Sequence, residues 1–376
     1  MTKQDSMDNE ILFSALKIIG NNESARKEFT KALLKIEKIL TIENKSVRDD
    51  ITGPLVDSLY AESSVLSKSI KGGLIFDFYY NSKIAREFIM SIELEPDHVW
   101  EPQTTRVLKY FSKGAKNVIV GGAFFGDQVI IISDYIKDGD GVCHAFEPNQ
   151  KQFKLLEKNI IDNNLNNTVA HKLALWSSAG KTLNLGYKSK VISDKIISKP
   201  FSLMDEGNFT ALIEKNKLSY NYGKVYTTTI DNYGKENNLD QINLIMLDLE
   251  GSEIKALKGA QHYLNKKDNK PVVVFEIHKL YEDWNSGLNE TKIVKFLESF
   301  GYKLFAIRDY QGNVNMSDRP IELIPSNNVY LKGPPHGFNM LAIEDISQLN
   351  DEFILTENVS PKLLKHKDPA LHQPLH

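Results

Sequence analysis

The sequence predicts an α/β protein built on a doubly wound, mostly parallel sheet. Short continuous apolar runs, such as KNVIVG at 116–121 and PVVVFEI at 271–277, are typical of strands buried on both faces. Apolar residues recur at helical spacing in residues 150–163. Strands that alternate with helices in this way indicate a parallel sheet with helices on both sides.

The predicted elements follow one another along residues 101–345. Strands are expected at 116–121, 142–147, 167–175, 243–249, 271–277, 302–307 and near 338–343. Helices are expected at about 126–137, 150–163, 253–264 and 290–300. Periodicity is weak between 186 and 225, a segment that is either a loop covering a substrate or variable surface.

The rest of the chain is expected to form three further parts. Residues 1–68 read as a helical extension because Phe29, Leu33, Ile36 and Leu40 form one apolar stripe. Such a stripe packs against the main domain or a second subunit, so a homodimer through these helices is one expected arrangement. We interpret residues 69–100 as a connector or cap and residues 346–376 as a polar tail.

Composition excludes several classes of protein. With 46 basic and 49 acidic side chains the formal net charge is −3, which does not fit a general nucleic-acid binder. The single cysteine, Cys143, excludes a disulfide framework and a thiolate zinc cluster. No run approaches the ~18 apolar residues of a membrane span, and the polar start is unlike a secretory signal. We therefore expect a cytoplasmic protein.

A glycine turn after the first strand points to a nucleotide-type ligand. Gly121, Ala123 and Gly126 fall on the spacing of the dinucleotide fingerprint, with alanine in the middle place. Alone the match is weak, since many such turns only pack a helix on a strand. Glu147, at the end of the next strand, lies where a carboxylate accepts hydrogen bonds from both hydroxyls of a ribose.

The residues around the turn favour a cationic nucleoside. Phe124 and Phe125 follow the alanine, and Asp127 begins the helix just past the last glycine. An acid at a helix start repels a phosphate but tolerates a sulfonium, so the electrostatics favour S-adenosylmethionine (SAM) over NAD.

The chain resembles the FkbM-type SAM-dependent methyltransferases over about residues 101–345. The resemblance rests on six segments in order: GGAFFG, HAFEPNQKQFKLLEKNI, HKLALW, VYTTTIDNY, LDLEGSEIKALKGA and VVVFEIH. It implies a Rossmann-like sheet of the class I methyltransferase type and a SAM-dependent activity.

The resemblance also implies roles for particular residues. Gly122, Ala123 and Gly126 would line the cofactor, Glu147 would hold its ribose, and residues 248–253 would flank the reacting end. Glu101 begins a segment, EPQTT, that looks like the lead-in to the cofactor site. The family usually has an acid where this chain has Val120, and Asp127 is a candidate to replace its charge.

Polar side chains end two strands of the predicted sheet. Asp248 and Glu250 follow one strand, and Glu276 and His278 end the next. If the strands are neighbours, these four groups meet at the carboxyl edge of the sheet, where open α/β folds bind ligands. They are candidates for acid–base chemistry or for ligands of a divalent metal. A helix cap at Glu250 and a structural role for His278 are the alternatives.

The sequence therefore predicts a SAM-dependent O-methyltransferase. Its acceptor would be a hydroxyl of a sugar, a glycan or another small polar metabolite, which makes carbohydrate modification the expected role. A nicotinamide-dependent oxidoreductase on the same kind of sheet and a non-catalytic nucleoside-binding protein are the competing hypotheses.

Overall fold

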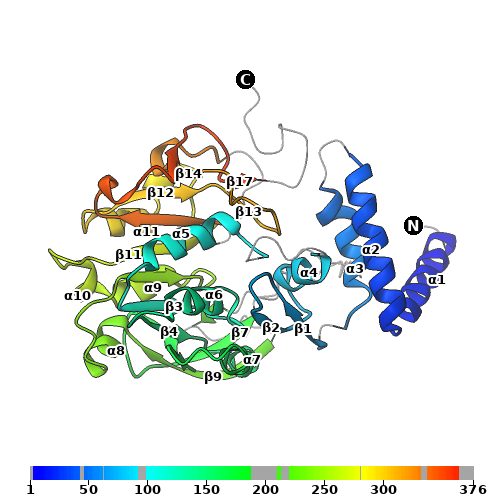
Figure 1. Cartoon of the computed structure of the whole chain (residues 1–376), viewed down its shortest axis with the longest axis horizontal. Coiled ribbons are helices and arrows are strands. Elements are labelled where there is room, and N and C mark those ends of the chain that lie inside the picture. Colours follow the sequence, from blue (N-terminus) through cyan, green and yellow to red (C-terminus); the bar gives the residue numbers. More distant parts are fainter. Residues whose placement is uncertain are drawn as a thin grey trace.

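The structure, a computed structural model, describes residues 3–42, 46–61, 63–91, 99–187, 210–212, 220–279, 281–331 and 337–363. Within these residues nine strands form a central sheet in the order β16-β14-β12-β15-β11-β10-β3-β4-β5 (Figure 1). The strands are β3 (Asn117–Gly121), β4 (Val142–Phe146), β5 (Thr168–His171), β10 (Leu244–Leu247), β11 (Val272–His278), β12 (Lys303–Ile307), β14 (Ile321–Pro325), β15 (Gly337–Ile343) and β16 (Phe353–Leu355).

The sheet is mostly parallel, as predicted. Neighbouring strands from β5 through β4, β3 and β10 to β11 pair in parallel. The strand β15 lies between β11 and β12 and runs antiparallel to both. β14 and β16, which the sequence pattern did not predict, extend the edge beyond β12. The order of β3, β4 and β10 places their carboxyl ends side by side.

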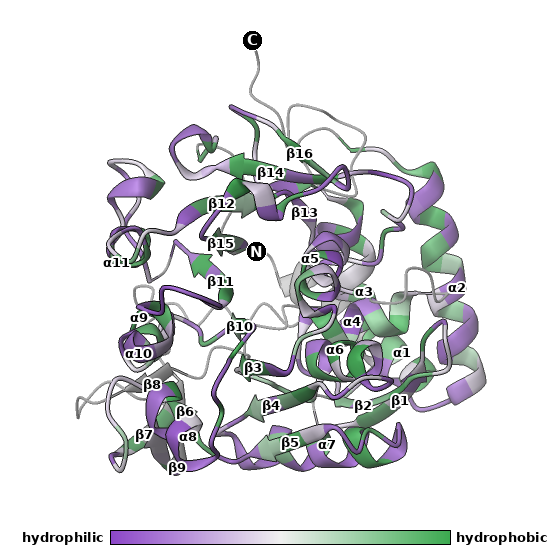
Figure 2. Cartoon of the chain, turned by 60° about the vertical axis from the view of Figure 1, so that its left-hand side comes forward, coloured by the Kyte–Doolittle hydropathy of each residue, from purple (hydrophilic) through white to green (hydrophobic). Residues whose placement is uncertain are grey.

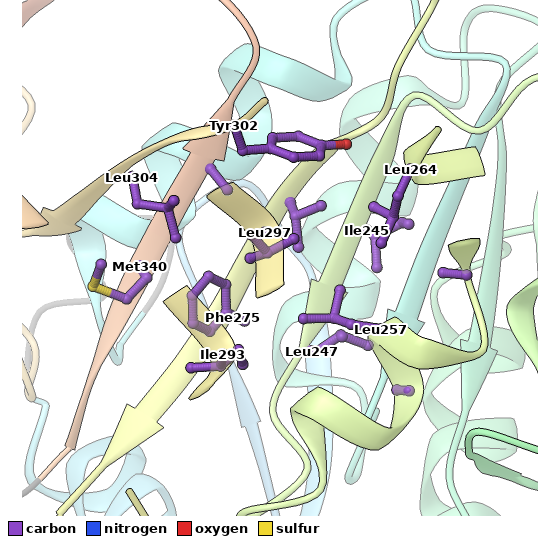
Figure 3. Packing of buried hydrophobic residues seen from close by; sticks show 14 of the residues in the cluster. Ile245, Leu247, Leu257, Leu264, Phe275, Ile293, Leu297, Tyr302, Leu304 and Met340 are labelled. Carbon is purple, nitrogen blue, oxygen red and sulfur yellow. The ribbon is translucent and has the colours of Figure 1, made fainter. Parts of the chain in front are cut away.

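Helices cover both faces of the sheet because alternate residues of its strands are buried on opposite sides. The strands are mainly hydrophobic (green in Figure 2). On one side Ile245, Leu247 and Phe275 pack with Leu257 and Leu297 of the covering helices (Figure 3). The helices of the domain are α5 (Pro102–Ser112), α6 (Asp127–Ile136), α7 (Gln150–Asp162), α8 (Ile230–Glu236), α9 (Glu253–Lys258), α10 (Gln261–Leu264) and α11 (Lys292–Glu298).

The N-terminal part lies at one end of the molecule (blue in Figure 1). It contains α1 (Lys3–Gly20), α2 (Glu23–Ile39), η1 (Arg48–Thr52), α3 (Gly53–Asp57), β1 (Val65–Ser69), β2 (Ile75–Tyr79) and α4 (Lys83–Met90). β1 and β2 form an antiparallel hairpin, so the expected boundary at residue 68 falls inside β1. The buried Asn159 of α7 fastens the hairpin by accepting from Asp77 N (2.7 Å) and donating to Asp77 O (2.9 Å).

The apolar stripe of α2 is only partly used. Leu33 is buried and Phe29 packs beside it against the hairpin, but Ile36 and Leu40 are exposed. The homodimer through these helices stays a prediction. In the described part of the chain no helix has both the length and the apolar character needed to cross a bilayer.

Two predicted elements are divided in the structure. The strand expected at 167–175 is β5 of the central sheet followed by β6 (Ala174–Leu175), which pairs with β9 (Tyr220–Thr228) in a smaller sheet. The helix expected at 253–264 breaks at Gly259, where a Cβ would lie 2.2 Å from Trp176 O.

The smaller elements complete the fold. The second sheet also contains β7 (Thr182–Tyr187) and β8 (Thr210–Leu212), and β13 (Asp309–Tyr310) pairs with β17 (Lys362–Leu363). Three short helical turns are η2 (Leu288–Glu290), η3 (Ser326–Asn328) and η4 (Ile346–Gln348). Most of the weakly periodic segment 186–225 and the end of the tail lie outside the described residues.

Candidate active site

A cavity of about 460 Å³ opens at the carboxyl ends of β3, β4, β10 and β11. Nine of the ten residues singled out from the sequence line it, namely Glu101, Gly121, Gly122, Ala123, Glu147, Asp248, Glu250, Glu276 and His278. Gly126 does not. It is the N-cap of α6, at a φ of 99°, and a Cβ there would meet Leu156 Cδ1 at 3.0 Å. Its glycine is explained by this backbone conformation and by packing.

The floor of the cavity is formed where the end of β3 and its turn lie close to the end of β10. Asp248 N donates to Gly121 O (3.0 Å), which continues the pairing of β3 and β10 past the strands. Gly122 has a φ of 76°, and a Cβ there would lie 1.7 Å from Asp248 O. Only glycine fits, because any side chain would push the turn away from β10.

Glu147 is fixed by backbone donors at the end of β4. Phe124 N donates to Glu147 Oε2 (2.8 Å) and Asn149 N donates to Glu147 Oε1 (2.7 Å). Burial raises the pKa of this carboxyl to about 7, although both backbone hydrogen bonds act in the opposite direction. Each carboxylate oxygen has two acceptor sites, so capacity remains on the cavity side for hydroxyl donors.

Glu101 reaches the cavity from the start of α5, where its backbone is left-handed at a φ of 53°. Asn339 Nδ2, on β15, donates to Glu101 Oε2 at 2.7 Å. The first turn of α5 is capped from a distant part of the chain, since Asp309 accepts from Gln103 N (3.0 Å) and Thr104 N (2.7 Å). β13 and β15 therefore hold Glu101 in place.

Three carboxyl groups meet between the ends of β10 and β11. Leu247 pairs with Phe275, so the next residues, Asp248 and Glu276, lie opposite each other. Glu253, at the start of α9, joins them, and carboxylate oxygens of the three residues lie within 4.8 Å of one another. One oxygen of Glu253 also accepts from Leu249 N (2.7 Å).

Glu250 and His278 stand beside this acid cluster of Asp248, Glu253 and Glu276. β10 ends at Leu247, so Glu250 belongs to the following turn, at a φ of 51°, rather than to the strand. Tyr281 OH donates to Glu250 Oε2 (3.4 Å), and the Tyr281 and His278 rings lie 5.6 Å apart. Gly337 leaves room for both strand-end groups, since a Cβ there would meet His278 at 2.5 Å and Glu276 at 2.6 Å.

The cavity concentrates negative charge in a region of low dielectric. Burial is the main cause that raises the pKa of Glu101 and Glu253 to about 8 and that of Asp127 to about 7. It also raises the pKa of Glu276 well above its ordinary value, with Asp248 and Glu250 adding repulsion. A cation in the cavity would stabilise the ionised forms of these acids.

Sequence reasoning missed the residues that support the site. Glu253 was expected to suit a helix cap and, from the family resemblance, to flank the reacting end, but it was not among the four candidate catalytic residues, and it completes the acid cluster. Asp309 and Asn339 act on α5 from more than two hundred residues away, and neither lies in a motif. The only local signal was Asn339, a polar residue in an otherwise apolar strand segment.

Comparison with known proteins identifies the domain. Residues 121–304 match the family model described as "Methyltransferase FkbM domain". No curated protein matches the chain. Together with the observed strand order, the family match confirms the predicted fold, a Rossmann-like sheet of the class I methyltransferase type.

Several solved structures align with the chain at low similarity. A methyltransferase FkbM from Methylobacillus flagellatus KT has 13% identity and a TM-score of 0.34, over 84% of this chain and 58% of that one. TYW2 of M. jannaschii, solved with AdoMet, has 12% identity and a TM-score of 0.32, over 75% and 86%. Precorrin-6y C5,15-methyltransferase of Geobacter metallireducens GS-15 has 10% identity and a TM-score of 0.33, over 67% and 88%. At these scores the alignments assign neither a substrate nor a residue role.

Gly122→Ala tests the approach of the two strand ends. The matched control is Gly114→Ala, because Gly114 also has a positive φ (70°) but has no atom near its missing Cβ. We expect the control to cost about 1 kcal/mol of unfolding free energy and Gly122→Ala at least about 3 kcal/mol, measured by urea denaturation. Equal costs would show that no steric contact at Gly122 shapes the cavity.

The raised pKa values predict that stability falls with rising pH. Between the ordinary glutamate pKa of 4.5 and the folded value of about 8, the unfolded chain has lost protons that the folded protein keeps. We expect the unfolding free energy to decrease from pH 5 to pH 8. Glu253→Gln should flatten this slope by up to about 1.4 kcal/mol per pH unit, whereas Glu298→Gln, on the exposed face of α11, should leave it unchanged. A slope that Glu253→Gln does not alter would contradict the assignment.

Proposed function

Because the chain carries a methyltransferase FkbM domain and is thus a SAM-dependent methyltransferase, we propose that it methylates a hydroxyl of a sugar or other small polar acceptor. The observation that supports this function best is that the glycine turn, Glu147 and two members of the acid cluster, Asp248 and Glu276, line one cavity. A nicotinamide oxidoreductase is disfavoured, since the helix start at the turn carries Asp127, which would repel a pyrophosphate.

The residues present fit SAM, which would supply an electrophilic methyl group on a sulfonium. Gly121, Gly122 and Ala123 would lie against the cofactor, since the turn offers backbone without bulk to the cavity. Glu147 would accept hydrogen bonds from the ribose hydroxyls. Asp127, Glu101 and the acid cluster would stabilise the positive charge of the sulfonium. None of these acids forms an ion pair with another described residue, so their ionised forms are costly to bury without a cation.

The chain's own contribution to the reaction would be orientation and proton removal. A hydroxyl placed between Asp248 and Glu276 would be held by carboxylate acceptors on two rigid strand ends. The proton would pass to Glu276 or to the His278 ring, both of which line the cavity. The turn with Glu250 and Tyr281 would close one side of the reacting end.

The acid cluster also fits a divalent cation. Three carboxylate oxygens within 4.8 Å of one another are ligands that Mg²⁺ or Ca²⁺ accepts, and such an ion acidifies a bound hydroxyl. We favour direct acid–base work, because Glu276 and His278 can take the proton without an ion. Transfer measured in EDTA, with and without added Mg²⁺, separates the two.

Glu147→Gln tests the cofactor assignment. The amide keeps the shape of the side chain but loses charge and one acceptor, so we expect S-adenosylhomocysteine (SAH) to bind about 10- to 100-fold more weakly by calorimetry, the scale of hydrogen bonds to a charged group. Glu157→Gln, on the exposed face of α7, is the control and should bind as the wild type does. Unchanged affinity in Glu147→Gln would refute the ribose contact.

Replacement of the reacting-end groups tests the enzymatic function. With methyl-tritiated SAM and fractionated cellular glycans and metabolites, we expect label in an O-methylated product. Glu276→Gln and His278→Asn should differ in their rates of methyl transfer. Loss of the true base lowers that rate about 10² to 10⁴-fold and removes one limb of the pH profile, whereas the affinity for SAH stays the same.

Other outcomes would identify a different protein. Label transfer to carbon or nitrogen would overturn the O-methyl proposal but leave the methyltransferase. Small and equal effects of every substitution, without any transfer of label, would favour a non-catalytic nucleoside-binding protein.

A further inference from the structure

One wall of the cavity is built by segments outside the matched domain. Ser82, Lys83 and Ile84 come from the start of α4, and Trp100, Gln311 and Lys362 complete this wall. All six lie outside residues 121–304, whereas the turn, Glu147 and the acid cluster lie inside. The wall therefore lies outside the part of this chain that the family model matches.

A second, small cavity of about 30 Å³ adjoins this wall. It shares Lys83, Trp100, Gln311 and Lys362 with the large cavity, so the two meet at these side chains. Its described lining carries three basic groups, Arg48, Lys83 and Lys362, against one acid, Asp49. This sign of charge is opposite to that of the acid cluster.

The two lysines supply the positive charge at this junction. Arg48 is committed to Glu37 and Glu87, with which it forms ion pairs at 2.5 and 2.6 Å. Asp49 lies 3.5 Å from Arg86. Lys83 and Lys362 are both half-buried and both line the two cavities. Lys83 makes no ion pair with another described residue. The start of α4 adds the partial positive charge of a helix N-terminus beside Lys83.

We propose that Lys83 and Lys362 form a subsite for an anionic group of the methyl acceptor, a phosphate or a carboxylate. This inference rests on the proposed function, because the acceptor's hydroxyl must lie at the acid cluster while its anion lies at the lysines. The opposite charges of the two groups of side chains orient such an acceptor in one direction, and a neutral sugar of the same size lacks this anchor. Specificity then comes from segments outside the matched domain.

Calorimetry on the full chain saturated with SAH tests the subsite. The probes are inorganic phosphate, glucose 1-phosphate, glucuronate and, as the uncharged match, glucose. We expect the wild type to bind a charged probe at least tenfold more tightly than glucose, with the preference between phosphate and carboxylate identifying the anion. Lys83→Gln and Lys362→Gln should each weaken that binding about tenfold or more, and Lys83→Arg should retain most of it. Lys255→Gln, exposed on α9, is the charge-matched control.

Three results would overturn the inference. One is that no charged probe binds better than glucose, and another is that the glutamine variants bind the probe as the wild type does. The third is a parallel loss of SAH affinity in these variants, which would mean that the lysines hold the carboxylate of the cofactor. Failure of SAH to bind the wild type would instead contradict the proposed function, so the two failures are distinguishable.

Discussion

The cavity depends on one backbone contact, the approach of the turn after β3 to the end of β10. Asp248 N donates to Gly121 O, and the absence of a side chain at Gly122 lets Asp248 O come close. This contact brings a cofactor-type turn and the first member of the acid cluster onto the same floor. Because β11 is the next strand along, Glu276 follows in register. The arrangement of the reacting end is thus a property of strand pairing rather than of loops.

The second constraint is charge. Glu101, Asp127, Glu147, Asp248 and Glu276 line one cavity, and Glu253 lies beside Asp248 and Glu276. Burial raises the pKa of each of these six carboxyl groups. Such a group lowers the stability of the folded protein at neutral pH unless a cation or a proton compensates. Clustered buried acids do not stabilise the folded state, so the presence of this cluster favours a ligand with positive charge. A sulfonium meets that requirement, and the pyrophosphate of a dinucleotide does not.

Whether the sequence could predict a site residue depended on how far away in the sequence its interaction partners lie. Glu147 was found because a strand, a turn and an acid lie within about 20 residues of sequence, a spacing set by local geometry. Asp248 and Glu276 were found because each ends a buried run. Gly126 was assigned to the cofactor on spacing and on the family resemblance, whereas its φ and its packing against Leu156 account for it. Asp309 and Asn339 were beyond reach, since their partners at the start of α5 lie more than two hundred residues away in the sequence. The divided strand at 167–175 and the break at Gly259 follow from contacts with the smaller sheet, which periodicity does not report.

The capping of α5 by Asp309 has a consequence for how the protein matures. Gln103 and Thr104 are separated from their acceptor by 206 and 205 residues, and Arg106 donates to Met316 O across 210. The first turn of that helix therefore cannot receive this cap until the chain has been synthesised past residue 309, and closing so large a loop is slow. Until then Glu101 has no fixed position, and a nascent chain that already contains every strand from β3 to β11 still lacks one wall of its pocket. The complete pocket would thus form only after residues 309–339 dock against the start of α5.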